Sequence, residues 1–270
     1  LLRIGVTALA CFALAALSVI PEARVVVNKE HSRTAGERDA FDRFQQRIQA
    51  LETTHPRLSD GGQPLAAGTL STPPPSDGQL ATVKKAYRET VMDMEHYSEE
   101  YDESLERNLS AEFGEGIARA VECGSVLTPA LRNTLHESAV DAKQRRSRLC
   151  HALDTEDESL QTAATTLRDI EQLTTEAEGS TLGDSFETLD ARWDRLSRAQ
   201  HRTEQLLTDQ QVELHDRHSV APRLGGPISL HEYLYSNEPY THPVLAEATA
   251  LLDSVHTAQR RTAIALSRRV

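Results

Sequence analysis

A long stretch without glycine, from Thr128 to Glu178, constrains the fold of this chain more than any other feature. Its single proline, Pro129, stands at the start. Thr128 can cap a helix, and proline suits the first helical position because its missing N–H group is not needed there. We therefore predict one helix of about 50 residues, roughly 75 Å long at 1.5 Å per residue, which Gly179 ends.

Apolar residues recur along this predicted helix with the heptad spacing of supercoiled helices. The two rows of the seam comprise Leu135, Ala142, Leu149, Glu156, Ala163, Ile170 and Ala177, and Ala139, Arg146, Leu153, Leu160, Leu167 and Thr174. Arg146 and Glu156 stand where apolar residues are expected. We expect their long side chains to reach solvent at the edge of a groove, the alternative being that they set the register of a specific contact.

A second seam follows on a helix predicted over residues 184–217. It comprises Phe186, Leu189, Trp193, Leu196, Gln200, Thr203, Leu207, Gln210 and Leu214, so the only tryptophan is expected to face the seam. Two seams joined by a few residues fold back as an antiparallel hairpin. Shorter helices are predicted over 79–94, 98–113, 229–235 and 244–269. Because no strand-like alternation occurs, the predicted fold class is all-α, an antiparallel coiled coil or helical bundle.

Residues 4–20 (IGVTALACFALAALSVI) carry no charge. As a helix this segment spans roughly 25 Å, and extension to Val27 gives about 36 Å, enough to cross a bilayer core of about 30 Å. We therefore predict an N-terminal transmembrane helix, with membrane contact through residues 4–27. The alternative is a secretory signal with its cleavage site at residues 16–18.

Basic residues near this segment predict its orientation. Arg24, Lys29, Arg33 and Arg38 follow the segment, whereas only Arg3 precedes it. The positive-inside rule therefore predicts a membrane-anchored protein whose helical domain is cytoplasmic. If the segment is a cleaved signal instead, the domain is secreted or lies at the cell surface.

Composition divides the chain into three predicted parts. Residues 1–52 comprise the transmembrane helix and an amphipathic extension, whose stripe is Phe41, Phe44, Ile48 and Leu51. We expect this stripe to pack against the helical domain and not to lie on the membrane surface. Residues 53–78 are rich in proline and glycine and are predicted to be a disordered linker. Residues 79–270 form the predicted helical coiled-coil domain.

The charge of the chain bears on its source and its partners. The formal net charge is -12, and lysine occurs only at Lys29, Lys84, Lys85 and Lys143. An acidic, lysine-poor composition is typical of proteins from salt-loving archaea, where salt screens the repulsion. It also argues against nucleic acid as a partner. The three cysteines are scattered without metal-ligand spacing, which favours reduced thiols inside a cell.

Three stretches resemble a family of haloarchaeal proteins known only as a domain of unknown function. They are Tyr87–Gly114 (YRETVMDMEHYSEEYDESLERNLSAEFG), Leu127–Leu135 (LTPALRNTL) and Tyr233–Arg261 (YLYSNEPYTHPVLAEATALLDSVHTAQRR). The resemblance implies a haloarchaeal source and a helical, membrane-associated protein. It implies no activity, cofactor or catalytic residue.

The sequence contains no phosphate-binding, dinucleotide-binding, serine-hydrolase or zinc-protease motif. His215 and His218 have metal-like spacing, but they stand at a predicted helix end without a third ligand, so we expect a capping or solvent-facing role. His231, His242 and His256 lie near the C-terminal turn and, with Glu232, are the constellation on which an enzyme site could be built. We assign no catalytic, cofactor-binding or metal-ligating residue, and no cofactor.

Other clusters have simpler interpretations. The aromatic cluster Tyr87, Tyr97, Tyr101 and Phe113 is expected to be core packing, with a binding surface as the alternative. Cys150 and His151 point about 100° apart on a helix and are not expected to form a catalytic pair. The basic clusters, which comprise Lys143, Arg145, Arg146 and Arg148, and Arg260, Arg261, Arg268 and Arg269, are expected to form interhelical ion pairs and not a patch for nucleic acid or anionic lipid.

These observations predict a membrane-anchored scaffold or signal-relay component that acts through a protein partner or as a homo-oligomer. Heptad surfaces serve association better than pocket formation, which also favours a protein that is not an enzyme. Two alternatives remain open. One is an enzyme with a site at the Tyr/His-rich end of the bundle, and the other is a membrane-tethered, nucleic-acid-binding regulator.

Overall fold

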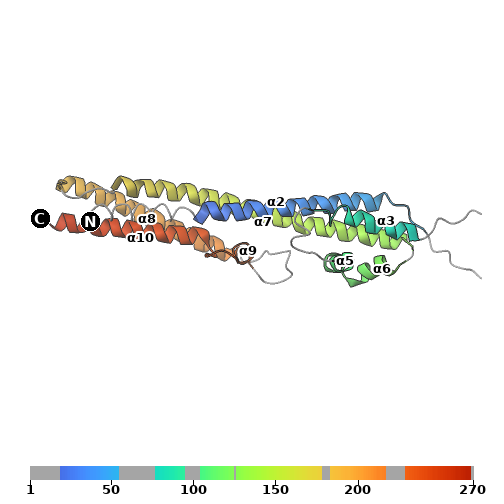
Figure 1. The fold of residues 1–270 in the computed structure, drawn as a ribbon. Coiled ribbons are helices and arrows are strands. Elements are labelled where there is room, and N and C mark those ends of the chain that lie inside the picture. The colour runs from blue at the N-terminus through green and yellow to red at the C-terminus, as the bar shows by residue number, and fades with distance from the viewer. Residues whose placement is uncertain are drawn as a thin grey trace, which may run out of the picture. The chain divides into compact units, whose positions relative to one another are not determined.

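The computed structural model describes residues 19–54, 77–94, 104–124, 126–177, 183–216 and 229–268. In these ranges the chain forms helices and connecting turns, and no strand occurs (Figure 1). The prediction of an all-helical fold is confirmed for this part of the chain.

The long helix is α7, Pro129–Ala177, with 49 residues. Its start is as predicted, because the Leu131 N–H donates to Thr128 Oγ1 at 3.1 Å. All thirteen residues of the predicted seam are buried, and none is more than 5% exposed. Arg146 and Glu156 are among them, so the expectation that these two side chains reach solvent is wrong. The predicted stop at Gly179 lies outside the described residues.

The chain forms two compact units, to both of which α2 (Val19–Gln49) and α7 contribute. Unit 1 comprises Leu1–His31 and His151–Val270, and unit 2 comprises Ser32–Cys150.

Unit 2 packs α3 (Asp77–Arg88), α5 (Leu105–Phe113) and α6 (Glu115–Cys123) with its parts of α2 and α7. Gly114 separates α5 from α6 with φ +92°, a backbone conformation that favours glycine. The stripe Phe41, Phe44 and Ile48 is buried in this core. Its predicted packing against the helical domain is therefore confirmed.

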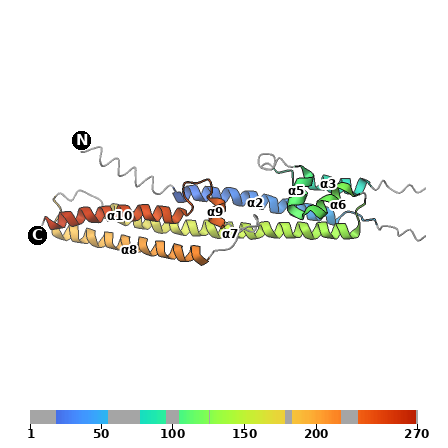
Figure 2. The same cartoon turned by 90° about the horizontal axis from the view of Figure 1, so that it is seen from below.

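Unit 1 contains α8 (Phe186–Asp216), α9 (Leu230–Leu234) and α10 (Pro243–Ser267). Figures 1 and 2 show α8 and α10 side by side and running in opposite directions. Gln259 Nε2 donates to Gln200 Oε1 at 2.8 Å, and Leu196 and Ala258 share a core cluster with the end of α7. The start of α8 therefore lies beside the end of α10.

The second seam is only partly buried. Leu189, Leu196 and Thr203 are buried, but Phe186 is 52% and Trp193 is 37% exposed, so the seam is not fully covered at these two positions. That Trp193 faces the seam stays a prediction. The register of the two antiparallel helices gives the reason. Since Gln200 faces Gln259, Trp193 comes level with the last turn of α10, and Phe186 lies beyond it.

The predicted N-terminal transmembrane helix is wrong. No helix in the described part of the chain is long and apolar enough to span a membrane. Residues 4–18, with the alternative cleavage site, lie outside the described residues. The rest of the expected span belongs to α2, where Ile20, Ala23 and Val27 are buried against protein. The cytoplasmic location, inferred from basic residues around that span, stays a prediction.

Polar contacts fix this segment within unit 1. The Ile20 N–H donates to Glu247 Oε2 at 2.8 Å, and the Arg24 guanidinium binds the Asp157 carboxylate at 2.8 and 3.0 Å. Glu22 and Arg24 lie between the buried Ile20, Ala23 and Val27, although Val25 is 68% exposed. Residues 19–27 are thus the start of an amphipathic helix, whereas a membrane helix is apolar on all sides. Of the predicted linker, residues 55–76 lie outside the described residues.

Candidate functional site

The structure brings two residues of the predicted histidine constellation together. The rings of His231 and His242 lie 5.4 Å apart, in and after α9. Glu232 has a different task, since its carboxylate and the Ser229 side chain form a capping box at the start of α9. His256 stands fourteen residues after His242 along α10, roughly 20 Å at 1.5 Å per residue.

The histidine pair lies at a buried carboxylate on α7. Glu156 Oε1 accepts a hydrogen bond from the Tyr235 hydroxyl at 3.1 Å and lies 3.3 Å from His231 Nε2. All three side chains are largely buried. Because a buried carboxylate is stable only with donors around it, these contacts explain how a glutamate can occupy the seam. We call Glu156, His231 and Tyr235 the Glu156 cluster.

The electrostatics of the cluster favour hydrogen bonding over proton transfer. Burial, followed by the charge of Glu156, raises the pKa of Tyr235 far above its ordinary value, so its hydroxyl stays neutral and acts as a donor. Burial, followed by the proximity of His231, lowers the pKa of His242, which favours its neutral form. Burial also raises the pKa of Tyr240, whose hydroxyl has no hydrogen-bond partner within the described residues.

Contacts of α9 with two other helices suggest what the cluster does. Tyr233 donates to Glu30 Oε1 on α2 at 2.5 Å, while Tyr235 and His231 contact Glu156 on α7. Three alternate positions, His231 and Tyr233 in α9 and Tyr235 at its C-cap, thus bind two separate helices. The arrangement fastens a five-residue helix, too short to be stable alone, to unit 1.

Unit 2 contains a second buried polar cluster, around Arg146. Its guanidinium binds both oxygens of Glu112, one of them at 2.8 Å, and Glu37 Oε2 at 3.1 Å. It also lies over the Phe41 ring, 4.7 Å from the ring centre. Burial alone would lower the pKa of Arg146, but the hydrogen bonds and charges of Glu112 and Glu37 outweigh it and raise the pKa. We call Arg146, Glu37 and Glu112 the Arg146 cluster.

The other clusters singled out from the sequence have structural roles where they are described. Lys143 binds Asp42 at 2.5 Å and Arg145 contacts Glu112 at 3.4 Å, which confirms interhelical ion pairs for these two as well as for Arg146. Tyr87 and Phe113 pack at 5.7 Å in the core of unit 2, as expected. Tyr97, Tyr101 and His218 lie outside the described residues.

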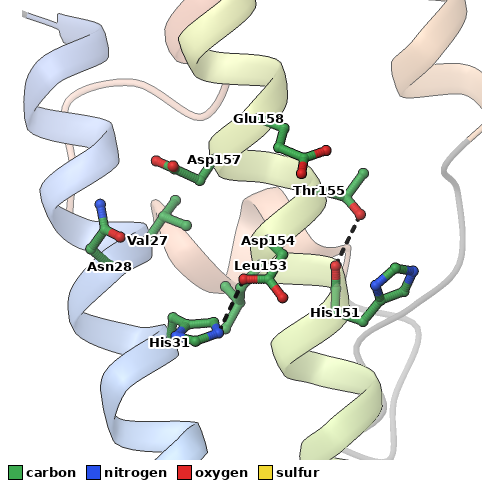
Figure 3. Close-up of a pocket in the computed structure, with 9 residues that line it drawn as sticks. All are labelled: Val27, Asn28, His31, His151, Leu153, Asp154, Thr155, Asp157 and Glu158. Atoms are coloured by element: carbon green, nitrogen blue, oxygen red, sulfur yellow. Dashed lines mark hydrogen bonds and ion pairs between the residues drawn. The ribbon is translucent and has the colours of Figure 1, made fainter.

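A cleft of about 440 Å³ lies between α2 and α7 in unit 1 (Figure 3). His31 reaches from α2 to Asp154, with 3.1 Å between Nε2 and Oδ1. Figure 3 shows His151 on the opposite side of α7, pointing away from this pair. Asp157, which also lines the cleft, is neutralised by Arg24. No group of three metal-ligating side chains converges within the described ranges.

Two exposed surfaces of unit 1 combine apolar side chains with charge. The aromatic row of α8 comprises Phe186 and Trp193 with the exposed carboxylates of Glu187, Asp190 and Asp194. Helical spacing places Asp190 between the two aromatic rings, at i+4 from the first and i−3 from the second. In the part of the chain that the structure describes, none of these carboxylates forms an ion pair.

The second surface is the arginine face of α10. Ile264 is 54% exposed and has Arg260, Arg261 and Arg268 at i−4, i−3 and i+4. No ion pair within the described residues involves these arginines, and the Arg260 guanidinium donates only to Thr257 Oγ1. The expectation of interhelical ion pairs is therefore wrong for this second basic cluster. Arg269 lies outside the described residues.

Sequence reasoning missed the acidic partners of the buried clusters. In an acidic chain with many glutamates, no sequence pattern distinguished Glu37, Glu112 and Glu247 from the exposed ones. Glu247 is buried, and its carboxylate caps the start of α2 through the Ile20 N–H. Burial raises its pKa, the hydrogen bond from Ile20 opposes this, and the charge of Glu171 adds to it. The available signal was indirect, since an arginine on an apolar seam requires carboxylates on the facing helices.

Comparison with curated proteins and with solved structures finds no match. A family model does match, along most of the chain, and it confirms the resemblance to a domain of unknown function. The match carries no information on a haloarchaeal source or on membrane association. The chain belongs to the family described as a domain of unknown function (DUF7260), whose model matches residues 18–259.

Proposed function

We propose that this protein is a protein-interaction scaffold or signal-relay component that binds other proteins through helical surfaces of unit 1. The observation that carries the proposal is the aromatic row of α8. The only tryptophan of the chain, Trp193, is 37% exposed, and Phe186, two helical turns before it, is 52% exposed, in a chain with 4% aromatic residues. Tryptophan is enriched among the few residues that supply most of the binding energy in protein interfaces.

The polar clusters support association over catalysis. In the Glu156 cluster, the carboxylate, the hydroxyl and the imidazole are engaged with one another, and they fasten α9 in place. The 440 Å³ cleft is lined by other residues, and its two histidines point to different sides of α7. A reaction site needs a nucleophile or base aimed at a bound substrate, and neither arrangement offers one.

The test is chemical cross-linking in cells that make the protein, followed by identification of the proteins attached to it. The variant is Phe186→Ser with Trp193→Ser, and the matched control is Val212→Ser, which removes another exposed apolar side chain of α8. We expect the first variant to lose specific cross-linked proteins and the control to retain them. Identical cross-linking by the wild type and both variants, all folded by circular dichroism, would overturn the proposal.

A further inference from the structure

The two exposed surfaces of unit 1 carry opposite charge. The aromatic row presents three carboxylates, Glu187, Asp190 and Asp194, beside its rings. The arginine face presents three guanidiniums around Ile264. After Asp253 the sequence contains four arginines and no acidic residue, in a chain whose net charge is -12. A basic, apolar surface is therefore unusual for this molecule, and an acidic, apolar surface would complement it.

The aromatic row provides that counterpart in the same chain. Both surfaces combine large apolar side chains with exposed charges on the same helix. Asp190 lies about one turn from both aromatic rings, and Arg260, Arg261 and Arg268 lie about one turn from Ile264. Guanidinium groups also stack favourably on tryptophan and phenylalanine rings. The register set by Gln200 and Gln259 places both surfaces at the same end of unit 1, where α8 begins and α10 ends.

The two surfaces do not satisfy each other within one chain. In the antiparallel pair, Gln259 points toward α8, and Ile264 stands five residues later, which rotates it about 140° around α10. The exposure of Ile264 and of Trp193 agrees with this geometry. The charges of each surface are therefore available to another molecule.

We propose that unit 1 binds a second copy of this chain, with the aromatic row of α8 seated against the arginine face of α10 in the other copy. The inference rests on the proposed interaction function and names its partner. Opposite charges steer the two copies together and fix their register, while Phe186, Trp193 and Ile264 bury apolar surface between them. Each copy presents both surfaces, so its aromatic row can bind one neighbouring copy and its arginine face can be bound by another.

The experiment is a charge exchange measured by analytical ultracentrifugation of the full chain over a wide concentration range. One variant is Asp190→Arg with Asp194→Arg on α8, and the other is Arg260→Glu with Arg261→Glu on α10. We expect each to raise the dissociation constant of self-association roughly tenfold or more, because like charges then face each other. An equimolar mixture of the two variants should restore association, since each reversed surface then meets an opposite one.

Matched controls reverse exposed charges elsewhere on the same helices, Asp209→Arg on α8 and Asp253→Arg on α10. They should leave the dissociation constant within about twofold of the wild type, since they lie outside both surfaces. In about 1 M salt the effects of reversal should shrink, because the Debye length falls to roughly 3 Å. The emission of Trp193, the only tryptophan, should shift to shorter wavelength as the copies associate.

The outcomes separate this inference from the proposed function. A wild-type chain that stays monomeric at every concentration, or two variants whose mixture does not regain association, would overturn the second copy as the partner. The interaction function would survive that result if cellular cross-linking still depended on Phe186 and Trp193. Self-association that depends on both charged surfaces would support the inference whether or not other proteins are captured.

Discussion

Arg146 and Glu156 stand ten positions apart on α7, both on the seam and both buried, yet the two units compensate their charges differently. In unit 2, Arg146 binds two carboxylates, those of Glu37 and Glu112. In unit 1, Glu156 binds a hydroxyl and an imidazole, of which only the imidazole can carry a charge.

The difference indicates how each unit should respond to mutation. In a buried ion cluster the attraction between opposite charges offsets a large cost of removing them from water. Removal of one member therefore leaves the others charged and desolvated. Loss of Glu156 leaves no buried carboxylate behind, and the hydroxyl and the imidazole that lose their acceptor are less costly to bury unpaired than a carboxylate. Unit 2 should therefore be the more sensitive of the two at its buried charge.

The largest effect is expected from Arg146→Met. This change removes the guanidinium that Glu37 and Glu112 share. Their carboxylates keep longer ion pairs, Arg33 with Glu37 at 3.7 Å and Arg145 with Glu112 at 3.4 Å. We expect a loss of about 3–5 kcal/mol in the free energy of unfolding. Urea unfolding followed by circular dichroism measures it. The control is Arg148→Met, an exposed arginine on the same helix, which should change stability by less than about 0.5 kcal/mol. Equal effects of the two substitutions would show that the buried carboxylates of the Arg146 cluster do not depend on Arg146 for stability.

A smaller loss is expected from Glu156→Leu. The Tyr235 hydroxyl and the His231 ring then lose their buried acceptor, which should reduce the free energy of unfolding by about 2 kcal/mol. The same urea titration measures it, with the exposed Glu158→Leu as the control. If Glu156→Leu destabilised the chain more than Arg146→Met, the proposed contrast between the units would be reversed.

The long helix and its buried seam could be predicted from the sequence because their signals are local. A cap, a proline and a repeated spacing act within one helix, and all thirteen seam residues are buried as the pattern requires. The stripe of Phe41, Phe44 and Ile48 was likewise visible, and its packing in unit 2 follows from its period. These features need no knowledge of which helices meet.

The failures concern contacts between distant segments. The apolar run that predicts a transmembrane helix extends into residues 19–27, but that interpretation ignored Glu247 on α10, 227 positions from Ile20, which caps the start of α2. The exposure of Trp193 depends on where α10 ends relative to α8. The burial of Arg146 depends on carboxylates from α2 and α5. Heptad spacing indicates that a face is covered, but it does not identify the covering residues.

Two buried tyrosines sharpen the comparison further. Tyr87 in unit 2 donates to the neutral Asn108 Oδ1 at 2.6 Å, whereas Tyr235 in unit 1 donates to the Glu156 carboxylate at 3.1 Å. We expect the charge of the acceptor to determine how much each hydrogen bond stabilises the fold. Tyr235→Phe should then reduce the free energy of unfolding by about 2 kcal/mol and Tyr87→Phe by about 1 kcal/mol. If the length of the hydrogen bond determines its strength instead, Tyr87→Phe should cause the larger loss of stability. Urea unfolding of the two variants distinguishes these cases directly.

The smallest effect concerns pH and is expected in unit 1, at Glu247. Unfolded chains lose this proton near the ordinary value of 4.5, while the folded state holds it to a higher pH because burial raises the pKa. Between these two values the folded state binds more protons, so this group's contribution to stability is full below pH 4.5 and is lost as pH rises through the folded pKa. His242 acts in the opposite direction, since its lowered pKa gives a contribution that is present above the ordinary value of 6.5 and lost as pH falls.

Comparison of the wild type with Glu247→Gln isolates the first of these effects, because His242 is common to both proteins. The glutamine keeps an acceptor for the Ile20 N–H but does not titrate. The stability of the wild type relative to this variant should therefore fall as pH is raised from about 4 to 7, whereas the wild type relative to the exposed Glu158→Gln should show no such trend. A flat difference for Glu247→Gln would mean that the carboxylate capping α2 is hydrated in the folded state, and the start of α2 would then be less firmly held in unit 1 than its buried contacts indicate.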